Sequence, residues 1–264
     1  MRYHSEQEVI ITGNQTDASK RLHLHALLDH AQILDMVNCE KKLGLTSDLM
    51  AEKKVVWILL SIHIKVFKDM PKEKDTLVLH TWSRGVKGLK FYRENRYYKD
   101  SIREENLLGV STSEWIIADE KDHTPKRPSV LLDINEFKQI SHPEVACVDR
   151  VERLKSFVNS DKGIKVFSHI VNYSDLDVNV HLHNTHYIKF AFDAFALYKG
   201  YNPETQAILF NDFIIQFEKE LFYGEHLDVY VFEQDEYTYF EGVNEDGKSS
   251  FVIKTDIRIK DEEK

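Results

Sequence analysis

Proton-handling side chains crowd the stretch SDLDVNVHLHNTHYIKFAF, which spans residues 174–192. Its carboxylate, amide and imidazole residues are Asp175, Asp177, Asn179, His181, His183, Asn184 and His186. Carboxylates and imidazoles transfer protons near neutral pH, and an amide both donates to an anion and accepts from water. The stretch therefore indicates an acid–base site, a metal site or a polar loop that caps a helix.

Two ordinary interpretations compete with catalysis. Asn184 stands just before residues with helical spacing, where a side chain that caps a helix is expected. The spacing H-x-H-x-x-H of the three histidines is compatible with zinc, but no further Cys, His or carboxylate stands at a recognisable ligand spacing. We therefore expect no metal and no cofactor.

Composition argues against several other classes of protein. The 264 residues carry a formal net charge of −9, which disfavours bulk binding to nucleic acid. The sequence has no nucleophile elbow, no P-loop and no dinucleotide-binding glycine motif. Cys39 and Cys147 form no metal or redox motif, and neither a membrane-length apolar run nor a secretory signal stands out. These features predict a cytoplasmic protein without a membrane span.

The chain contains an internal repeat. Residues 17–28, DASKRLHLHALL, match residues 175–186, DLDVNVHLHNTH, when the shared HLH is aligned. Each stretch leads into residues of helical period, for which Gly44 and Gly200 are plausible stops. Residues 64–79 similarly match residues 214–229. Strand-like runs follow in both halves: TLVLHTW, LKFYRENRYY and STSEWIIAD in the first, and LDVYVFEQ, YTYFEGV and SSFVIKTDIRI in the second.

Each half is therefore predicted to be a long helix with an antiparallel sheet curled around it, an α+β fold. The predicted domains are residues 1–135 and 161–264, joined by a linker of mixed charge over residues 136–160. The HLH alignment pairs Asp177 with Ser19, Asn179 with Arg21, His181 with His23 and Glu220 with Met70. Because the first half lacks the amide and the acids, we expect the site in the second half alone.

A family resemblance rests on the same residues. DLDVNVHLHNTHYI resembles D-x-D-x-N-x-H-x-N-N-x-x-Y, the signature of the acyl-acyl carrier protein (acyl-ACP) thioesterases. The shorter motifs TW, SEW, KRP and QFEKEL extend the resemblance over most of the chain. It implies a tandem double hotdog fold and a thioester hydrolase that releases free fatty acid from acyl-ACP, which ends fatty acid synthesis.

The catalytic residues that the resemblance implies are Asp177, Asn179, His181 and Glu220. Water attacks the thioester carbonyl, with Glu220 or His181 as the general base and Asp177 orienting the imidazole. Asn179 and the N-terminus of the following helix stabilise the oxyanion. Two positions depart from the family pattern. Leu221 replaces a cysteine of the plant enzymes, and His183 replaces the first Asn of the pair that ends at Asn184.

The implied partner is an acidic acyl carrier protein. Bases recur at every third residue from Arg84 to Lys99, and we expect Lys90, Arg93 and Arg96, together with Asn184, to contact the carrier or substrate. Two alternative functions remain: an acyl-CoA thioesterase of the hotdog fold and a non-catalytic acyl-binding protein. The oligomeric state is left open, with a homodimer as one option.

Overall fold

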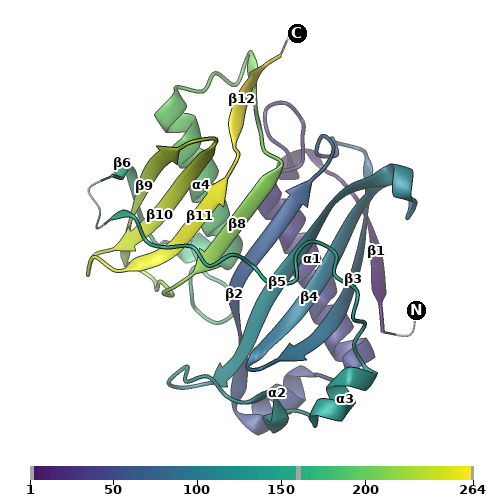
Figure 1. The fold of residues 1–264 in the computed structure, drawn as a ribbon. Coiled ribbons are helices and arrows are strands. Elements are labelled where there is room, and N and C mark those ends of the chain that lie inside the picture. Colours follow the sequence, from purple (N-terminus) through teal and green to yellow (C-terminus); the bar gives the residue numbers. More distant parts are fainter. Residues whose placement is uncertain (1–2, 159–161, 263–264) are drawn as a thin grey trace. The chain divides into compact units, whose positions relative to one another are not determined.

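A computed structural model describes residues 3–158 and 162–262 of the chain. It divides into two compact units (Figure 1). The first unit comprises the chain up to Thr12 together with Asp29–Val151, and the second comprises Gly13–Leu28 together with the chain from Glu152 onward. Residues 1–2, 161 and 263–264 of the predicted domains and residues 159–160 of the predicted linker lie outside the described residues.

The first unit contains an antiparallel sheet with strand order β1-β3-β4-β5-β2. Its strands are β1 (Ser5–Ile10), β2 (Val55–Val66), β3 (Thr76–Lys87), β4 (Lys90–Lys99) and β5 (Leu107–Asp119). The helices of the first half are α1 (Leu24–Asn38), α2 (Ser47–Lys53) and α3 (Ile134–Gln139), and a π-helical turn, Cys39–Leu43, continues α1. Strands β3, β4 and β5 confirm the three runs predicted from the sequence.

The second unit repeats this arrangement, with strand order β6-β9-β10-β11-β8. Its elements are β6 (Ile164–Ile170), α4 (Asn184–Lys199), β8 (Asp212–Phe217), β9 (His226–Gln234), β10 (Tyr237–Asn244) and β11 (Ser249–Thr255). A separate ribbon pairs β7 (Gln206–Leu209) with β12 (Arg258–Asp261). The same order of strands and the long helix in each half confirm the predicted double hotdog fold.

Two sequence expectations about element ends are resolved by local hydrogen bonds and backbone angles. Gly44 and Gly200 end the helical segments with φ of 71° and 63°, a region that glycine enters at little cost, so both predicted stops are confirmed. The run SSFVIKTDIRI is not one strand. It breaks at Asp256, whose Oδ1 accepts the backbone N–H groups of Asn211 and Asp212 at 2.7 and 2.9 Å.

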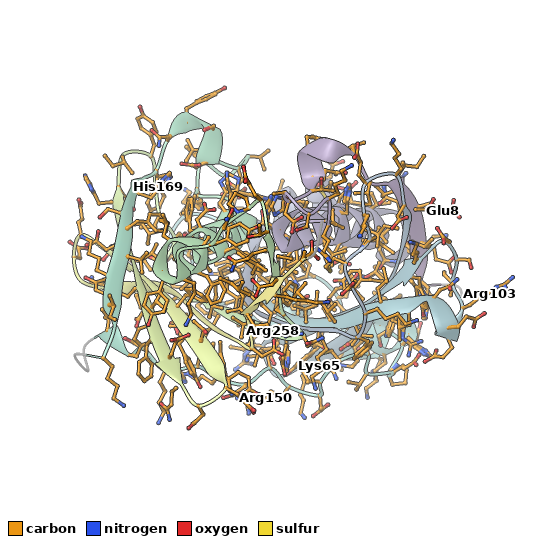
Figure 2. The ribbon with its side chains drawn as sticks, turned by 90° about the horizontal axis from the view of Figure 1, so that it is seen from above. Glu8, Lys65, Arg103, Arg150, His169 and Arg258 are labelled. Atoms are coloured by element: carbon orange, nitrogen blue, oxygen red, sulfur yellow. The ribbon has the colours of Figure 1, made fainter. Side chains whose placement is uncertain are left out.

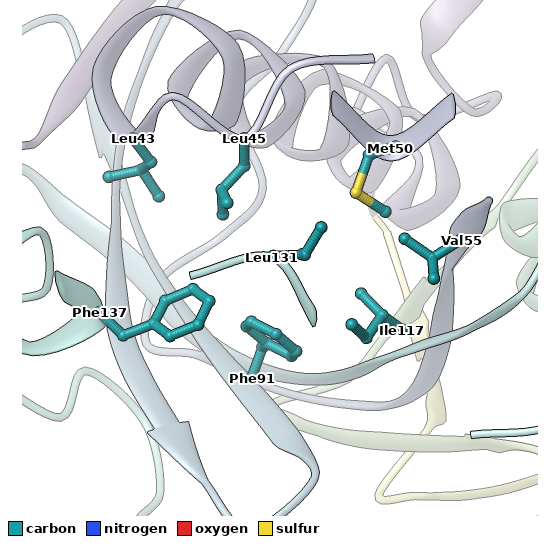
Figure 3. Packing of buried hydrophobic residues seen from close by; sticks show 8 residues of the cluster. All are labelled: Leu43, Leu45, Met50, Val55, Phe91, Ile117, Leu131 and Phe137. Atoms are coloured by element: carbon teal, nitrogen blue, oxygen red, sulfur yellow. The ribbon is translucent and has the colours of Figure 1, made fainter. Parts of the chain in front are cut away.

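Apolar side chains of α4 face the sheet of the second unit. On α4, Ile188, Ala191 and Phe195 are buried, and the Phe195 ring meets the ring of Phe240 on β10 edge-on at 6.5 Å. In the first unit a buried cluster closes one end of the sheet (Figure 3). Its members are Leu43, Leu45, Met50, Val55, Phe91, Ile117, Leu131 and Phe137. Burial of apolar surface of this kind is the main stabilising term of such a fold.

Several backbone N–H groups of the segment over residues 141–158 donate to buried carboxylates. In the first unit Ala146 donates to Glu94 at 2.9 Å and Val151 donates to Glu114 at 3.1 Å. In the second unit Phe157 donates to Glu241 at 2.8 Å. A buried carboxylate is costly unless it accepts hydrogen bonds, so these contacts explain why acids occupy the strand centres.

Candidate active site

The loop over residues 171–183 is called the second signature loop. One carboxylate fixes the conformation of its backbone. Oδ1 of Asp177 accepts the backbone N–H groups of Asn179 at 2.8 Å and of His181 at 3.2 Å. The N–H of Asp177 donates back to the carbonyl of His181 at 2.8 Å. Val180 completes the turn with a φ of 66°, which is rare for a β-branched residue. Asp177 therefore shapes the backbone from which Asn179 and His181 project.

His181 and Glu220 form a pair across two segments. Nδ1 of His181 lies 3.6 Å from Oε1 of Glu220, and the side chains are 19% and 36% exposed. The segments are joined because the N–H of Leu182 donates to the carbonyl of Leu221 at 2.8 Å. The Phe222 ring lies edge-on to the imidazole at 4.8 Å. The pair is thus shielded on one side and reachable by water.

Asn179 stands at the exposed tip of the loop. Its side-chain Nδ2 donates to Oδ2 of Asp177 at 3.4 Å. An amide has two N–H donors and one acceptor, so this contact uses one of its donors. Asn184 is the first residue of α4, and His183 occupies the cap position, so the capping interpretation of Asn184 is wrong.

Tyr187 is a site residue that sequence reasoning left unused. It is buried on α4, and its phenol has a hydrogen bond with the backbone of Leu221, next to Glu220. Burial, and then the charge of Glu220, raise the pKa of its phenol. The signal that points to it is the tyrosine that ends the family signature. Its position ties the segment that carries Glu220 to the helix.

The loop over residues 11–23 is called the first signature loop. Its hydrogen bonds show that the alignment of the two halves must be corrected. Oδ1 of Asp17 accepts the backbone N–H groups of Ser19 at 2.8 Å and of Arg21 at 3.0 Å, and Lys20 has a φ of 64°. These contacts reproduce those of Asp177, Asn179, His181 and Val180. Asp17 therefore corresponds to Asp177, and the alignment on the shared HLH is wrong by two residues.

The corrected register changes which residues differ between the halves. Asn179 corresponds to Ser19 and His181 to Arg21, while both loops keep the aspartate. The pairing of Glu220 with Met70 holds, because the turns that follow them match: Lys74 donates to Ile11 as Gly224 donates to Val171, both at 2.9 Å. At these positions the second half therefore has an amide (Asn179), an imidazole (His181) and a carboxylate (Glu220) that the first half lacks.

The basic run lies largely within ion pairs of the first unit. Arg93 is buried and its Nη1 donates to Oδ1 of Asn38 at 2.6 Å. Lys90 pairs with Glu114, and Arg96 pairs with Glu144. The burial of Arg93 argues against a direct contact with a partner, and the docking role of the run stays a prediction.

Three further findings bear on the sequence expectations. Within the described ranges, no group of His, Cys, Asp and Glu side chains has the arrangement that a metal ion needs. In those same ranges, no helix has both the length and the apolar character to cross a membrane. Both cysteines are free thiols, and burial raises the pKa of Cys39.

Comparisons with known proteins place this geometry in a family. Residues 2–134 match the model of the acyl-ACP thioesterase N-terminal domain, and residues 159–263 match that of the acyl-ACP thioesterase C-terminal domain. A search of curated proteins finds no match.

Solved structures share the fold. An acyl-ACP thioesterase from Bacteroides thetaiotaomicron is 18% identical with a TM-score of 0.80, and the match covers 97% of this chain and 98% of that one. A 12:0-ACP thioesterase from Umbellularia californica is 17% identical with a TM-score of 0.80, covering 98% of each chain. A putative oleoyl thioesterase from Lactobacillus plantarum is 19% identical with a TM-score of 0.77, covering 97% and 96%. Since the two family models together match most of the sequence, the chain belongs to the acyl-ACP thioesterase family.

Proposed function

We propose that this protein hydrolyses the thioester of acyl-ACP and releases free fatty acid and the carrier. The observation that carries the proposal is the His181–Glu220 pair, 3.6 Å apart and partly exposed, in the half of the chain that alone has these residues. A thioester needs an activated water to be hydrolysed at neutral pH, and an imidazole–carboxylate pair is a common general base. Membership of the family supplies the substrate class.

In the proposed reaction the pair takes a proton from water as the oxygen attacks the carbonyl carbon. The tetrahedral oxyanion then collapses, the carbon–sulfur bond breaks, and the thiolate leaves and is protonated. A base held at the reacting water contributes about 10²–10⁴-fold in rate. Phe222 covers one side of the imidazole and so limits its contact with bulk water.

The developing oxyanion requires hydrogen-bond donors. Asn179 offers an amide N–H at the tip of the loop, and α4 begins three residues after His181 with its backbone N–H groups and positive dipole end. Such donors stabilise a transition state more than a ground state when they are fixed in advance. Asp177 fixes Asn179 through both a backbone and a side-chain contact.

Apolar side chains beside the pair support an apolar substrate. Val178, Val180, Phe222 and Tyr223 are all exposed on the two segments that carry the pair. The corresponding residues of the first half are Ala18, Lys20, Lys72 and Glu73. Exposed apolar side chains grouped at one place commonly mark a binding surface. This difference fits an acyl chain or the arm that carries it.

The proposal is tested by a hydrolysis assay on acyl-ACP of graded chain length, with the same acyl groups on coenzyme A measured in parallel. Turnover that depends on the carrier supports it. Faster turnover of the acyl-CoA series, with inhibition by free coenzyme A, would assign the protein to the acyl-CoA thioesterases instead. Tight binding of acyl-ACP without turnover would show a non-catalytic acyl-binding protein.

We also propose that the carrier docks at the basic run, and the test changes two of its residues. Arg93 is left unchanged, because a carboxylate in its place would be buried beside Asp35, whose Oδ1 lies 3.9 Å from Nε of Arg93. Only Lys90 and Arg96 are changed, each to Gln. We expect KM for acyl-ACP to rise about threefold with kcat unchanged, because rim charges act mainly on association. An unchanged KM at low salt would place the docking surface elsewhere.

Three remaining expectations are part of the same proposal. The protein acts in the cytoplasm, its functional domains are residues 1–135 and 161–264 with 136–160 between them, and it needs no cofactor. Fractionation of cells, limited proteolysis and activity after dialysis against a chelator test them in turn. Light scattering during gel filtration distinguishes a monomer from a homodimer.

A further inference from the structure

A second group of titratable side chains lies at the base of the second signature loop. Asp175 is 7% exposed, and its Oδ2 accepts from Nε2 of His169 at 2.7 Å and from the N–H of Asn172 at 2.8 Å. Its Oδ1 lies 3.3 Å from Nδ1 of His186. Figure 2 labels His169, which stands on β6, whereas His186 stands on α4. One carboxylate thus joins a strand, a turn and a helix.

Asp175 is ionised at neutral pH. Burial alone would raise its pKa, but the hydrogen bonds from Asn172 and His169 outweigh burial and hold the pKa below its ordinary value. Burial lowers the pKa of His186, so this imidazole is predominantly neutral at pH 7. The group is therefore a buried carboxylate that His169 holds by a hydrogen bond and that His186 approaches from the other side. A hydrogen bond to an ionised carboxylate fixes the side chains that make it.

This group holds the segment from which His181 projects. The carbonyl of Asp175 accepts the N–H of His183 at 2.8 Å, and a bridge between Leu176 and Leu182 lies just inside that contact. His181 directly precedes Leu182, one residue of that bridge. Displacement of Asp175 would therefore move the imidazole relative to Glu220.

The first signature loop shows that the backbone does not require the carboxylate. His23 donates to the carbonyl of Gln15 at 2.9 Å, which is the same closing hydrogen bond. Gln15 stands where the second loop has Asp175, and the places of His169 and His186 are taken by Val9 and Ala26. The three titratable side chains are thus an addition of the second half.

The first loop is anchored at another position. Arg21 is buried, with its side chain 7% exposed, and it pairs with Glu262, which is 30% exposed. Arg21 corresponds to His181. An anchor at this position in the second loop would occupy the imidazole that the reaction needs.

We infer that Asp175, held between His169 and His186, is a positioning residue that anchors the second signature loop and leaves the His181 imidazole open to the reaction. The inference rests on the proposed function. Misplacement of a reacting group by about 1 Å costs on the order of 10²-fold in rate. An anchor at the base of the loop prevents such displacement without contacting the substrate.

The test replaces Asp175 with Gln, the residue of the first loop. We expect kcat on acyl-ACP to fall about 10–100-fold while KM changes less than about threefold. The pH midpoints of kcat/KM stay in place, because the titrating groups of the site are retained. Asp175→Asn, which keeps the size of the side chain, serves if the Gln variant does not fold.

Asp228→Asn is the matched control. This carboxylate of β9 also joins neighbouring elements, accepting from Ser168 at 2.7 Å and pairing with Lys165 at 2.8 Å, but it lies outside the signature loop. We expect its kcat to stay within twofold of the wild type. An Asp175 variant that matches this control would overturn the inference, and so would a shifted pH midpoint, which would mean that Asp175 exchanges the proton itself.

Amide hydrogen exchange over residues 176–183 separates this inference from the proposed function. We expect faster exchange in Asp175→Gln than in the wild type, a result that does not depend on turnover. If the wild type does not hydrolyse acyl-ACP but exchange is faster in the variant, the proposed function fails and the anchor stands. If the wild type is active and exchange is unchanged, the anchor fails alone.

Discussion

In the first signature loop Asp17 accepts the backbone N–H groups of Ser19 and Arg21, and in the second Asp177 accepts those of Asn179 and His181. The two loops therefore have the same pattern of backbone hydrogen bonds, and the shared aspartate has a structural role in both. What differs is the set of side chains that the turn presents. The comparison supports the proposal that the chemistry lies with the positions that changed, and it gives the unchanged aspartate the role of shaping the loop.

The largest effect is expected when the pair itself is removed. Glu220→Gln and His181→Gln should each lower kcat by about 10²-fold or more, because each removes part of the general base. Folding should be little affected, since both side chains are partly exposed. Steady-state kinetics on acyl-ACP and urea unfolding measure the two effects.

Met70→Gln and Arg21→Gln are the corresponding changes in the first half. The Met70 variant should retain full turnover, whereas Arg21→Gln should lose stability without losing kcat. If a first-half variant lowered kcat as much as Glu220→Gln, the reaction would not belong to the second half alone.

A smaller loss is expected at Asn179. Asn179→Ser introduces the residue of the first loop, Ser19, on a backbone that accommodates it. A hydroxyl still donates a hydrogen bond but does not reach as far as an amide, so kcat should fall about 10–100-fold. Kinetics on acyl-ACP check this, with Ser19→Asn as the control. Near-normal turnover of Asn179→Ser would remove the side chain from the oxyanion site.

The third effect concerns stability. Glu262→Gln leaves the buried guanidinium of Arg21 without its carboxylate partner, and we expect the free energy of unfolding to fall by about 1–3 kcal/mol. Because Glu262 is 30% exposed, the loss is smaller than for a fully buried pair. Urea unfolding gives the value, and kcat should stay within twofold.

Glu152→Gln provides the comparison for that measurement. Glu152 pairs with Lys254 at 2.9 Å and is 53% exposed, so its loss should cost less than about 1 kcal/mol. Equal losses from the two variants would show that Arg21–Glu262 is no special anchor of the first loop.

The sequence allowed the fold to be predicted because its signals are repeated and local. Strand runs with β-branched and aromatic residues, and glycines where the helical segments stop, recur in both halves. The family resemblance also identified His181, in the signature, and Glu220, in a separate downstream segment, as candidates. These signals depend on residue type and short spacing, which a sequence shows directly.

The register of the two loops could not be predicted in the same way. The shared letters HLH and an aspartate at the start of each stretch favour an alignment that pairs Asp17 with Asp175, whereas the backbone contacts show that Asp177 is the equivalent aspartate. The sequence predicts no role for Asp175, His169 or Tyr187, because the partners of these side chains come from separate elements. The burial of Arg93 was equally invisible, since a base in a strand points to either face.

His4, in the first unit, is a histidine that no proposed step uses. In the second half histidines line the signature loop, whereas in the first unit His4 is buried beside His80 at 2.8 Å and stacks on Trp82 at 5.3 Å. Burial, and then the neighbouring His80 and His142, lower the pKa of His4 to about 4. The folded state therefore binds fewer protons than the unfolded state between pH 6.5 and 4, and His4 reduces stability as the pH falls through that range.

His4→Phe keeps the stacking but cannot be protonated. Glu94 acts with the opposite sign, because burial raises its pKa to about 7 and the folded state takes up a proton as the pH falls. Since the wild type and the variant share Glu94, their difference isolates His4. We expect the variant to gain about 2 kcal/mol relative to the wild type between pH 7 and pH 5, measured by urea unfolding at each pH. Parallel stability curves would show that His4 titrates normally and that its burial carries no acid sensitivity.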